Sequence, residues 1–470
     1  MPVTKKMATS RSWLSLLMLG LLSACGVPVP PAENTGELVV GTRNYPATYF
    51  IAPDGEAAGY EHDVLRAFAE SQQWSVRWME KDDPAALFDA LDKRTLHMAA
   101  AALPQAVVKD RHFIAGPVLF ETPVHVIVPA GKPAPRSLRE LQGKRLALIA
   151  GSGHTPMLAR LKRKHAGLAW TTLQNVWPEE LLAQLQAGDY DAVIVNGMVY
   201  DPMRNLYPDL RVAFDLPDKQ KIVWALHPLS SQDLRIHLAR FIERARKDGT
   251  LARIHERYFG HVKQLDRSDV LGILERRPQR LPGLRRHFQE AQTLTGIDWR
   301  LLAAIGYQES QWNPYATSPT GVRGLMMLTG ETADRMGVSN RLDARQSIVG
   351  GARYLAMLKD SLPTRIVEPD RTWIALAAYN VGLGHLEDAR RIAQARGGNP
   401  DSWVDVKAAL PYLSRGTYRG VMRYGYARGY EALGLAENIR NYYDILLRLE
   451  PEYDSLINLS RRDTPAHAPG

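Results

Sequence analysis

The chain has 470 residues, of which 45% are hydrophobic and 23% are charged, and this composition is that of a globular protein with roughly two or three domains. Its formal charge of +9 suits an anionic partner such as a cell-wall polymer or a lipid headgroup, but it suits solubility alone equally well. No nucleic-acid motif accompanies the charge, so we expect no nucleic-acid partner.

Residues 1–24 are predicted to be a secretory signal. Lys5, Lys6 and Arg11 precede a short apolar run, and a basic start, an apolar core and small residues at the end are the parts of such a signal. The apolar run is shorter than the about 20 residues that a membrane-spanning helix needs. The residue that follows the signal is Cys25, the only cysteine of the chain.

The sequence Leu-Ser-Ala-Cys that ends at Cys25 resembles a bacterial lipoprotein signal. The resemblance implies that Cys25 is lipidated and becomes the first residue after cleavage. Gly26 follows it in place of an aspartate, which in enteric lipoproteins implies the outer membrane. We therefore expect a lipid-anchored protein on the periplasmic face of the cell outer membrane. A secreted protein with a chance cysteine, or an uncleaved anchor, is the open alternative.

Residues 25–36 are rich in proline and small residues and are predicted to be a tether. Over residues 37–263, expected strands alternate with expected helices, which predicts an α/β domain on a mostly parallel sheet. The expected strands are 37–42, 75–79, 145–149 and 191–195. The first expected helix is 61–71, with apolar Val64, Leu65 and Phe68 on one face. The other expected helices are 85–91, 156–164, 179–187, 231–248 and 250–258.

Residues 264–283 are rich in arginine, contain two prolines and are predicted to be a linker with a short helix at 270–274. Residues 284–457 show successive helical patterns without clear strands, which predicts a mainly helical domain. The polar tail 458–470 is predicted to be disordered. The expected helices of this second domain are 283–294, 298–309, 347–360, 371–379, 405–410 and 437–449.

Glu309 is the strongest candidate for a catalytic group. Asp298 is a good N-cap for its helix, and Leu302, Ile305 and Glu309 share one helix face. A carboxylate on an apolar face loses solvation, so its pKa rises, as a general acid working near neutral pH requires. A capping or surface glutamate at a helix end is the structural alternative.

Four motifs with this glutamate in the first of them follow one another along the chain. They are 307–314 (YQESQWNP), 318–327 (SPTGVRGLMM), 377–382 (AAYNVG) and 437–442 (ENIRNY). In order and spacing they resemble the soluble-lytic-transglycosylase family. The resemblance spans roughly residues 284–449 and implies a mainly α, lysozyme-like (α+β) transglycosylase domain that acts on the glycan strands of peptidoglycan.

By this resemblance Glu309 is the single catalytic acid and base, and Ser318 contacts the substrate near the acetamido group. All positions that the resemblance implies for substrate contact are Ser318, Met327, Tyr379, Asn380 and Tyr442. The chain departs from the family at Met327, where a glutamine is usual, and in the last motif, which has one extra residue and leaves Glu437 unassigned. The membrane-bound branch F of the family shares both departures.

A single carboxylate implies that the substrate supplies the second catalytic group, because most glycosidases need two carboxyl groups. Members of the family protonate the glycosidic oxygen between MurNAc and GlcNAc. The MurNAc 6-hydroxyl then closes on C1, which gives 1,6-anhydro-MurNAc ends without water. A hydrolysing, lysozyme-like muramidase and a non-enzymatic solute-binding or sensory lipoprotein are the open alternatives.

The N-terminal domain resembles the amino-acid-binding family of periplasmic solute receptors, on the motifs 54–55 (DG), 59–63 (GYEHD) and 141–145 (LQGKR). The resemblance implies a two-lobed α/β periplasmic-binding-protein-like domain that closes on a ligand, here a muropeptide or an amino-acid-like molecule. Arg111 matches the place of the arginine that clamps the ligand carboxylate.

Ser152 lies in a Gly-Ser-Gly sequence that opens a helix and could offer its N–H to the same anion. Asn196 stands where the family has an aspartate for the ligand ammonium, so a peptide stem, another anion or no ligand at all stays open. No metal cluster, phosphate loop or Ser/His/Asp constellation is visible in the sequence, and we expect no cofactor and no metal. His154 and His385 have no partner at ligand spacing and are expected to be surface or structural residues.

Overall fold

The computed structural model describes residues 28–453, apart from positions 46, 53–55, 82–83, 175, 261–264 and 320. The predicted signal, Cys25 and the polar tail lie outside the described residues. The described residues divide into two compact units: those of 28–50, 58–121 and 220–248 form the first, and those of 51–57, 122–219 and 249–453 form the second. No helix within the described ranges has both the length and the apolar character to cross a bilayer.

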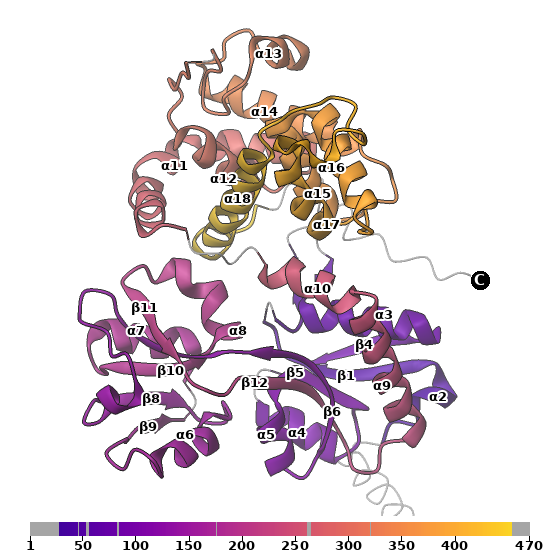
Figure 1. Cartoon of the computed structure of the whole chain (residues 1–470), viewed down its shortest axis with the longest axis vertical. Helices are drawn as coiled ribbons and strands as arrows, with labels where there is room; N and C mark the ends of the chain where they lie inside the picture. The colour runs from indigo at the N-terminus through magenta and orange to yellow at the C-terminus, as the bar shows by residue number, and fades with distance from the viewer. Residues whose placement is uncertain are drawn as a thin grey trace, which may run out of the picture. The chain divides into compact units, whose positions relative to one another are not determined.

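The first unit contains a five-stranded sheet of order β4-β1-β5-β12-β6 (Figure 1). β1 (Glu37–Thr42) pairs in parallel with β4 (Ser75–Glu80) and β5 (Met98–Pro104), whereas β12 (Gln220–Leu226) pairs antiparallel with β5. The sheet is therefore mixed, and the predicted parallel pairing is confirmed only for its early strands. The remaining elements are α2 (Ala32–Thr35), α3 (Tyr60–Gln72), α4 (Pro84–Asp92), α5 (Gln105–Asp110), β6 (Ile114–Thr122) and α9 (Gln232–Lys247).

The predicted tether is shorter than expected, because its second half folds onto the first unit. The backbone N–H of Val29 donates to the carbonyl of Arg94 at 2.8 Å, and Ala32 of α2 is buried. Proline and small residues suit an extended tether, but they also suit a short helical turn that starts after Pro31.

The second unit begins with another five-stranded sheet, of order β11-β7-β10-β8-β9. β10 (Ala192–Asn196) is buried at every position because it runs through the middle of this sheet. The other strands are β7 (Val124–Pro129), β8 (Leu146–Ile149), β9 (Thr171–Leu173) and β11 (Leu210–Asp215). The helices of this part are η1 (Leu138–Leu141), α6 (His154–Lys162), α7 (Pro178–Ala187), α8 (Gly197–Tyr200) and η2 (Asp201–Leu206). A separate two-stranded sheet is formed by β2 (Phe50–Ile51) and β3 (Ala57–Ala58).

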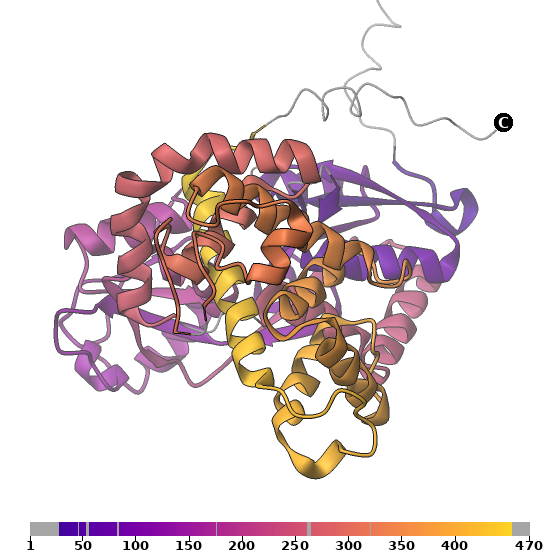
Figure 2. The same cartoon turned by 90° about the horizontal axis from the view of Figure 1, so that it is seen from above.

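The rest of the second unit is helical, as predicted (Figures 1 and 2). Its first helices are α10 (Thr250–Phe259), α11 (Arg267–Thr295), α12 (Trp299–Ser310), α13 (Gly330–Met336) and α14 (Ala344–Asp360). Its last are α15 (Asp370–Val381), α16 (Leu383–Ala395), α17 (Trp403–Ala409), η3 (Leu410–Ser414), η4 (Gly416–Tyr418) and α18 (Gly429–Leu449). One continuous core joins α11 to α18.

The prediction of a linker at 264–283 is wrong, because most of this segment belongs to the 29-residue helix α11. Val270, Ile273 and Leu281 of this segment are buried in the core of the helical part, and that burial favours helix over the local effect of Pro278 and Pro282. Tertiary packing has overridden the composition that suggested a linker.

Within the second unit, segments from 122–219 and 249–259 contact the later helices directly. Asn205 of η2 donates to the side-chain oxygen of Asn441 on α18 at 2.8 Å, and both side chains are buried. On α10, Arg257 pairs with Asp370 of α15 at 3.3 Å. The compact units therefore cut across the boundary predicted near residue 263.

Candidate active site

Helix α12 carries Glu309 in its last turn. Asp298 caps the helix, since its carboxylate accepts the backbone N–H of Arg300 at 2.7 Å, as predicted. The helix ends at Ser310, one residue after Glu309, and the next two residues, Gln311 and Trp312, adopt left-handed backbone angles, with φ of 53° and 59°. The N–H of Gln311 closes the end by donating to the carbonyl of Tyr307 at 2.7 Å.

The carboxyl group of Glu309 lies in a poorly solvated position. Its side chain is half-buried, and loss of solvation raises its pKa from 4.5 to about 7. Desolvation is the sole cause of this shift; among the described residues, neither a cation nor a second carboxylate contributes to it. A carboxyl with this pKa can give up and take back a proton near neutral pH.

Tyr379, at the end of α15, is the described site residue that interacts most clearly with Glu309. Its hydroxyl donates to the carbonyl of Met326 at 3.0 Å, and its ring lies 5.2 Å from that of Tyr354. Burial raises the pKa of Tyr379 well above its usual value, and the negative charge of Glu309 raises it further. The phenol therefore stays protonated beside the carboxylate.

The loop 318–328, which carries Ser318 and Met327, is held by several polar contacts. The hydroxyl of Ser310, next to Glu309, lies 2.8 Å from the carbonyl of Leu325. The buried hydroxyl of Ser347, on α14, accepts the backbone N–H of Met326 at 3.0 Å. These contacts tie the loop to α12 and α14.

Arg341 closes the same loop across its two ends. Its guanidinium donates to the carbonyls of Gly321 at 3.0 Å and Leu328 at 2.9 Å. Gly324 has a φ of +82°, and a Cβ there would lie 1.8 Å from the carbonyl oxygen of Arg341, so only glycine fits. Sequence reasoning did not assign Arg341, Ser310 or Ser347, because each acts through a contact that no local pattern reveals.

Three predicted contact residues lie at the rim of this arrangement. Met327 is half-buried and has a φ of +48°, which is uncommon for a residue other than glycine. Ser318 is half-buried in the turn where its N–H donates to the carbonyl of Val322 at 3.0 Å. Asn380 is exposed at the end of α15, one residue after Tyr379.

Tyr442, the last predicted contact residue, lies on α18 and packs against α12. Only 5% of its surface is exposed, and its ring lies 4.8 Å from that of Tyr307 on α12. Tyr307 and Glu309 are two residues apart, so they point to different sides of the helix. The ring of Tyr442 thus supports the helix that carries Glu309, and its contact with the substrate stays a prediction. Glu437 lies 3.4 Å from the ammonium of Lys407 and 3.3 Å from the guanidinium of Arg440, in an ion network of the helical part.

The predicted ligand contacts of the receptor-like part belong to both compact units. In the first unit, Arg111 caps the end of α5, and its guanidinium lies 4.6 Å from the ring centre of Phe88. In the second unit, the N–H of Ser152 donates to the carbonyl of Ile149 at 3.3 Å in the turn before α6, so it is already engaged. Asn196 caps α8 by accepting the N–H of Val199 at 3.0 Å, a role that an aspartate would fill equally well.

Within the described residues, no group of three His, Cys, Asp or Glu side chains is arranged to hold a metal ion. His154 is buried, and the ring of His385 lies 6.3 Å from that of Tyr424. Both histidines are thus packed among other side chains.

Two family models match the chain. Residues 286–401 match the transglycosylase SLT domain, and residues 38–261 match the bacterial extracellular solute-binding proteins, family 3. The first match contains Glu309, Ser318, Met327, Tyr379 and Asn380, whereas Tyr442 lies beyond it.

Similar full-length proteins cover both parts. A membrane-bound lytic murein transglycosylase F of Thiobacillus denitrificans (strain ATCC 25259 / T1) is 70% identical over 470 residues, 100% of each chain. Another, of Nitrosospira multiformis (strain ATCC 25196 / NCIMB 11849 / C 71), is 44% identical over 92% of this chain and 91% of its own. A solved structure of an ancestral arginine-binding protein bound to arginine is 21% identical, with a TM-score of 0.42, and covers 48% of this chain and 99% of that chain.

Proposed function

The chain belongs to the membrane-bound lytic murein transglycosylase F family, and on that premise we propose that Glu309 is its catalytic acid and base. The activity itself follows from the family: the protein is a lytic transglycosylase that acts on peptidoglycan and carries a solute-binding-protein-like domain. The observation that carries the assignment is the half-buried carboxyl at the end of α12 with a pKa of about 7.

In the first step, protonated Glu309 gives its proton to the glycosidic oxygen between MurNAc and GlcNAc, and the bond from that oxygen to C1 breaks. The 2-acetamido carbonyl of MurNAc stabilises the developing charge at C1, which is the known way for a glycosidase to work with one carboxylate. A pKa of about 7 leaves much of the enzyme protonated at neutral pH, ready for this step.

In the second step, the Glu309 carboxylate takes the proton of the MurNAc 6-hydroxyl while that oxygen bonds to C1. The product is a 1,6-anhydro end, Glu309 is protonated again, and no water is consumed. A paired carboxylate would raise the pKa of Glu309 by repulsion, yet desolvation alone accounts for the shift, which supports a mechanism with one carboxylate.

The test is release of anhydro-muropeptides from purified sacculi by the full-length Glu309→Gln protein. We expect release to be lost while circular dichroism shows an unchanged fold. Glu331→Gln, at an exposed position on α13, is the matched control and should keep full turnover. Retained turnover in Glu309→Gln would remove the assignment.

We also propose that residues 38–261 act as a receptor for an anionic wall fragment or an amino-acid-like molecule. The family-model match supports this role, and the exchange of the usual aspartate for Asn196 favours a ligand without an essential ammonium. Titration of muropeptides into the full-length protein and into Arg111→Ala decides the place of Arg111. A lost binding signal supports the ligand clamp, whereas unchanged binding with a lower unfolding temperature supports its packing on Phe88.

The proposed attachment is a lipid on Cys25 in the outer membrane. The relatives named membrane-bound support membrane association, and the Leu-Ser-Ala-Cys sequence supports its lipid form. Labelling of cells with a radioactive fatty acid should mark the protein but not Cys25→Ser. Density separation of the two membranes should place the labelled protein in the outer one; an unlabelled protein would contradict the proposal.

A further inference from the structure

The segment 410–430 presents an unusual set of side chains at the surface of the helical part. It contains five tyrosines and four arginines but no acidic residue. Tyr424, Tyr426 and Tyr430 are exposed at 60%, 69% and 51%. Exposed aromatic rings beside arginines are typical of binding surfaces, whereas isolated exposed apolar residues are common and need no explanation. We call residues 412–430 the Tyr/Arg surface.

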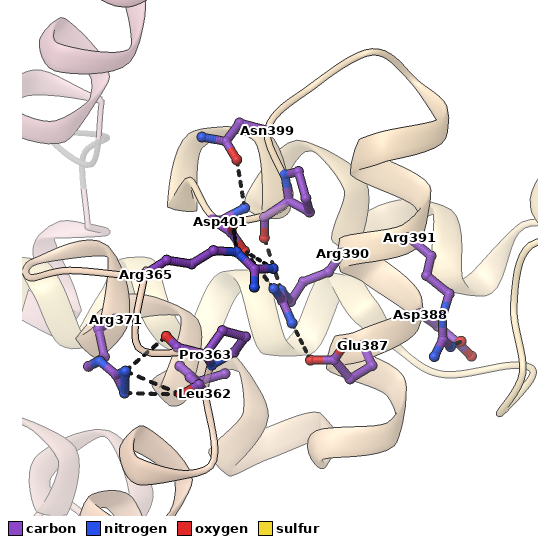
Figure 3. Close-up of polar contacts among 11 residues, drawn as sticks. Leu362, Pro363, Arg365, Arg371, Glu387, Asp388, Arg390, Arg391, Asn399 and Asp401 are labelled. Carbon is purple, nitrogen blue, oxygen red and sulfur yellow. Dashed lines mark hydrogen bonds and ion pairs between the residues drawn. The ribbon is translucent and has the colours of Figure 1, made fainter.

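This surface is built on a fixed support. The fully buried carboxylate of Asp388, on α16, accepts the backbone N–H groups of Arg423 and Tyr424, each at 2.7 Å. The guanidinium of Arg391 pairs with the same carboxylate at 2.7 Å, and Figure 3 shows the two side chains facing each other. A buried carboxylate with three donors holds its partners in place, so the loop is organised before anything binds.

Helix α16, which carries Asp388, is itself held in place by ion pairs. Arg390, the neighbour of Arg391 in the chain, pairs with Glu387 and with Asp401, and Arg365 pairs with the same Asp401 (Figure 3). Arg390 is buried, so these charges are only weakly screened by solvent. The network is structural, and the exposed residues of the loop are left to contact a partner.

The Tyr/Arg surface adjoins the predicted sugar-binding residues. A Cβ on Gly384, in the first turn of α16, would lie 2.8 Å from the ring of Tyr424, so ring and turn are in contact. This turn comes four residues after Asn380, the exposed residue of the Ala-Tyr-Asn motif. The surface therefore continues from the end of α15, where the substrate is expected to bind.

Two of the four arginines on this surface, Arg419 and Arg423, are available to bind an anion, whereas Arg428 pairs with Glu431. Arg415 lies 5.0 Å from the ring centre of Tyr412 and donates to the hydroxyl of Tyr430. Arg419 and Arg423 are exposed, and in the described part of the chain no carboxylate forms an ion pair with either. Arginine binds carboxylates through two parallel hydrogen bonds, and tyrosine offers an apolar ring face with a polar hydroxyl.

A membrane surface would also attract these arginines, but the side chains argue against it. Membrane-surface segments insert Trp, Phe or Leu into the lipid. Here Leu410 and Leu413 are buried in the core, and the exposed aromatic residues are all tyrosines. Ring faces of sugars and carboxylates of peptides fit this set of side chains better.

We propose that the Tyr/Arg surface binds the stem peptides and adjacent sugars of the peptidoglycan strand that is being cut. The tyrosines take sugar rings, and Arg419 and Arg423 take stem-peptide carboxylates. The proposal rests on the proposed function, because it extends the binding region of the same site. It makes the enzyme prefer strands that still carry their peptides.

The test uses the full-length protein in a Glu309→Gln background, so that binding is measured without cutting. Binding is compared on intact sacculi and on glycan strands whose peptides an amidase has removed and whose freed lactyl carboxylates have been converted to amides, so that the second sample carries no carboxylate. We expect Arg419→Ala with Arg423→Ala to weaken binding to intact sacculi about tenfold and to leave binding to peptide-free strands unchanged. Tyr426→Ala should weaken both. Arg286→Ala, at an exposed position on α11, is the control and should change neither.

Lysine replacements at 419 and 423 keep the charge but lose the paired hydrogen bonds, so they should recover only part of the binding. Equal binding of parent and double alanine variant to intact sacculi would overturn the proposal. The proposal would also be overturned if the double alanine variant lost as much binding to peptide-free strands as to intact sacculi. A third overturning result would be that the variant loses binding to vesicles of anionic phospholipid while its binding to sacculi is unchanged. Soluble products in these samples would instead reveal a failure of the Glu309 assignment, which the binding comparison does not depend on.

Discussion

Replacing Glu309 by glutamine is expected to stabilise the folded protein at neutral pH, although it abolishes turnover. Burial raises the pKa of this carboxyl from 4.5 to about 7, so folding makes it hold its proton more tightly. A tenfold change in proton affinity is worth about 1.4 kcal/mol, and the difference corresponds to roughly 3 kcal/mol. Since the side chain is half-buried and water reaches part of it, we expect about 2 kcal/mol.

The sign of the effect follows from proton binding. Between pH 4.5 and about 7, the folded state binds more protons at Glu309 than the unfolded state does. The free energy of unfolding of the unaltered protein therefore decreases as the pH rises through this window. Glutamine does not titrate, so the variant lacks this decrease. The two proteins should be about equally stable below pH 4.5 and differ fully above about 7.

Thermal unfolding of both full-length proteins between pH 4 and pH 8, followed by circular dichroism and tryptophan fluorescence, measures this difference. About 2 kcal/mol raises the unfolding temperature of a domain of this size by about 4–8 °C. Glu331→Gln, at an exposed position, should show no such pH-dependent gain. The reasoning would be refuted if Glu309→Gln and the unaltered protein had the same unfolding temperature. It would also be refuted if their unfolding temperatures differed by the same amount at every pH.

Three further changes test other parts of the structure. Arg341→Gln removes the guanidinium that closes the loop 318–328, so KM on glycan strands should rise about tenfold with a smaller effect on kcat; an unchanged KM would contradict this. Tyr379→Phe removes one hydrogen bond to Met326, so kcat should fall about fivefold, or about 1 kcal/mol, in steady-state assays, and full activity would contradict the positioning role. Burial raises the pKa of Glu61 in the first unit to about 8, so Glu61→Gln should gain stability as the pH rises from 4.5 to about 8; a pH-independent difference in unfolding temperature would contradict this.

The sequence was most informative where a pattern repeats along one element. The apolar face of α12 and its Asp298 cap are visible in the sequence, and the structure confirms the helix that carries Glu309. Helix α16 was missed for a physical reason. Asp388 and Arg390 are buried on its inner face and neutralised by ion pairs, so its pattern resembles that of an exposed polar segment.

Contacts between distant segments could not be predicted from the sequence. Arg341, Ser347 and Ser310 position the loop 318–328 through single hydrogen bonds to backbone atoms, and such bonds leave no periodic signal. Arg111 gives a second example: its place in the chain suggested a ligand clamp, and the contact of its guanidinium with the ring of Phe88 could not be predicted.

The antiparallel strands β7, β11 and β12 were likewise not predicted. Their residues pair with partners far away in the chain, so their register depends on tertiary structure. The alternation of strands and helices was still sufficient to indicate an α/β domain, because that inference depends on the order of elements and not on which strands pair.

The most direct test of the central claim is the fate of water during cleavage. Purified glycan strands are digested in ¹⁸O-labelled water, and the new ends are weighed by mass spectrometry. If Glu309 acts alone with the MurNAc 6-hydroxyl as the attacking group, the unaltered protein releases 1,6-anhydro ends without ¹⁸O, and Glu309→Gln releases none. Reducing ends that carry ¹⁸O, or anhydro ends released by Glu309→Gln, would contradict the account.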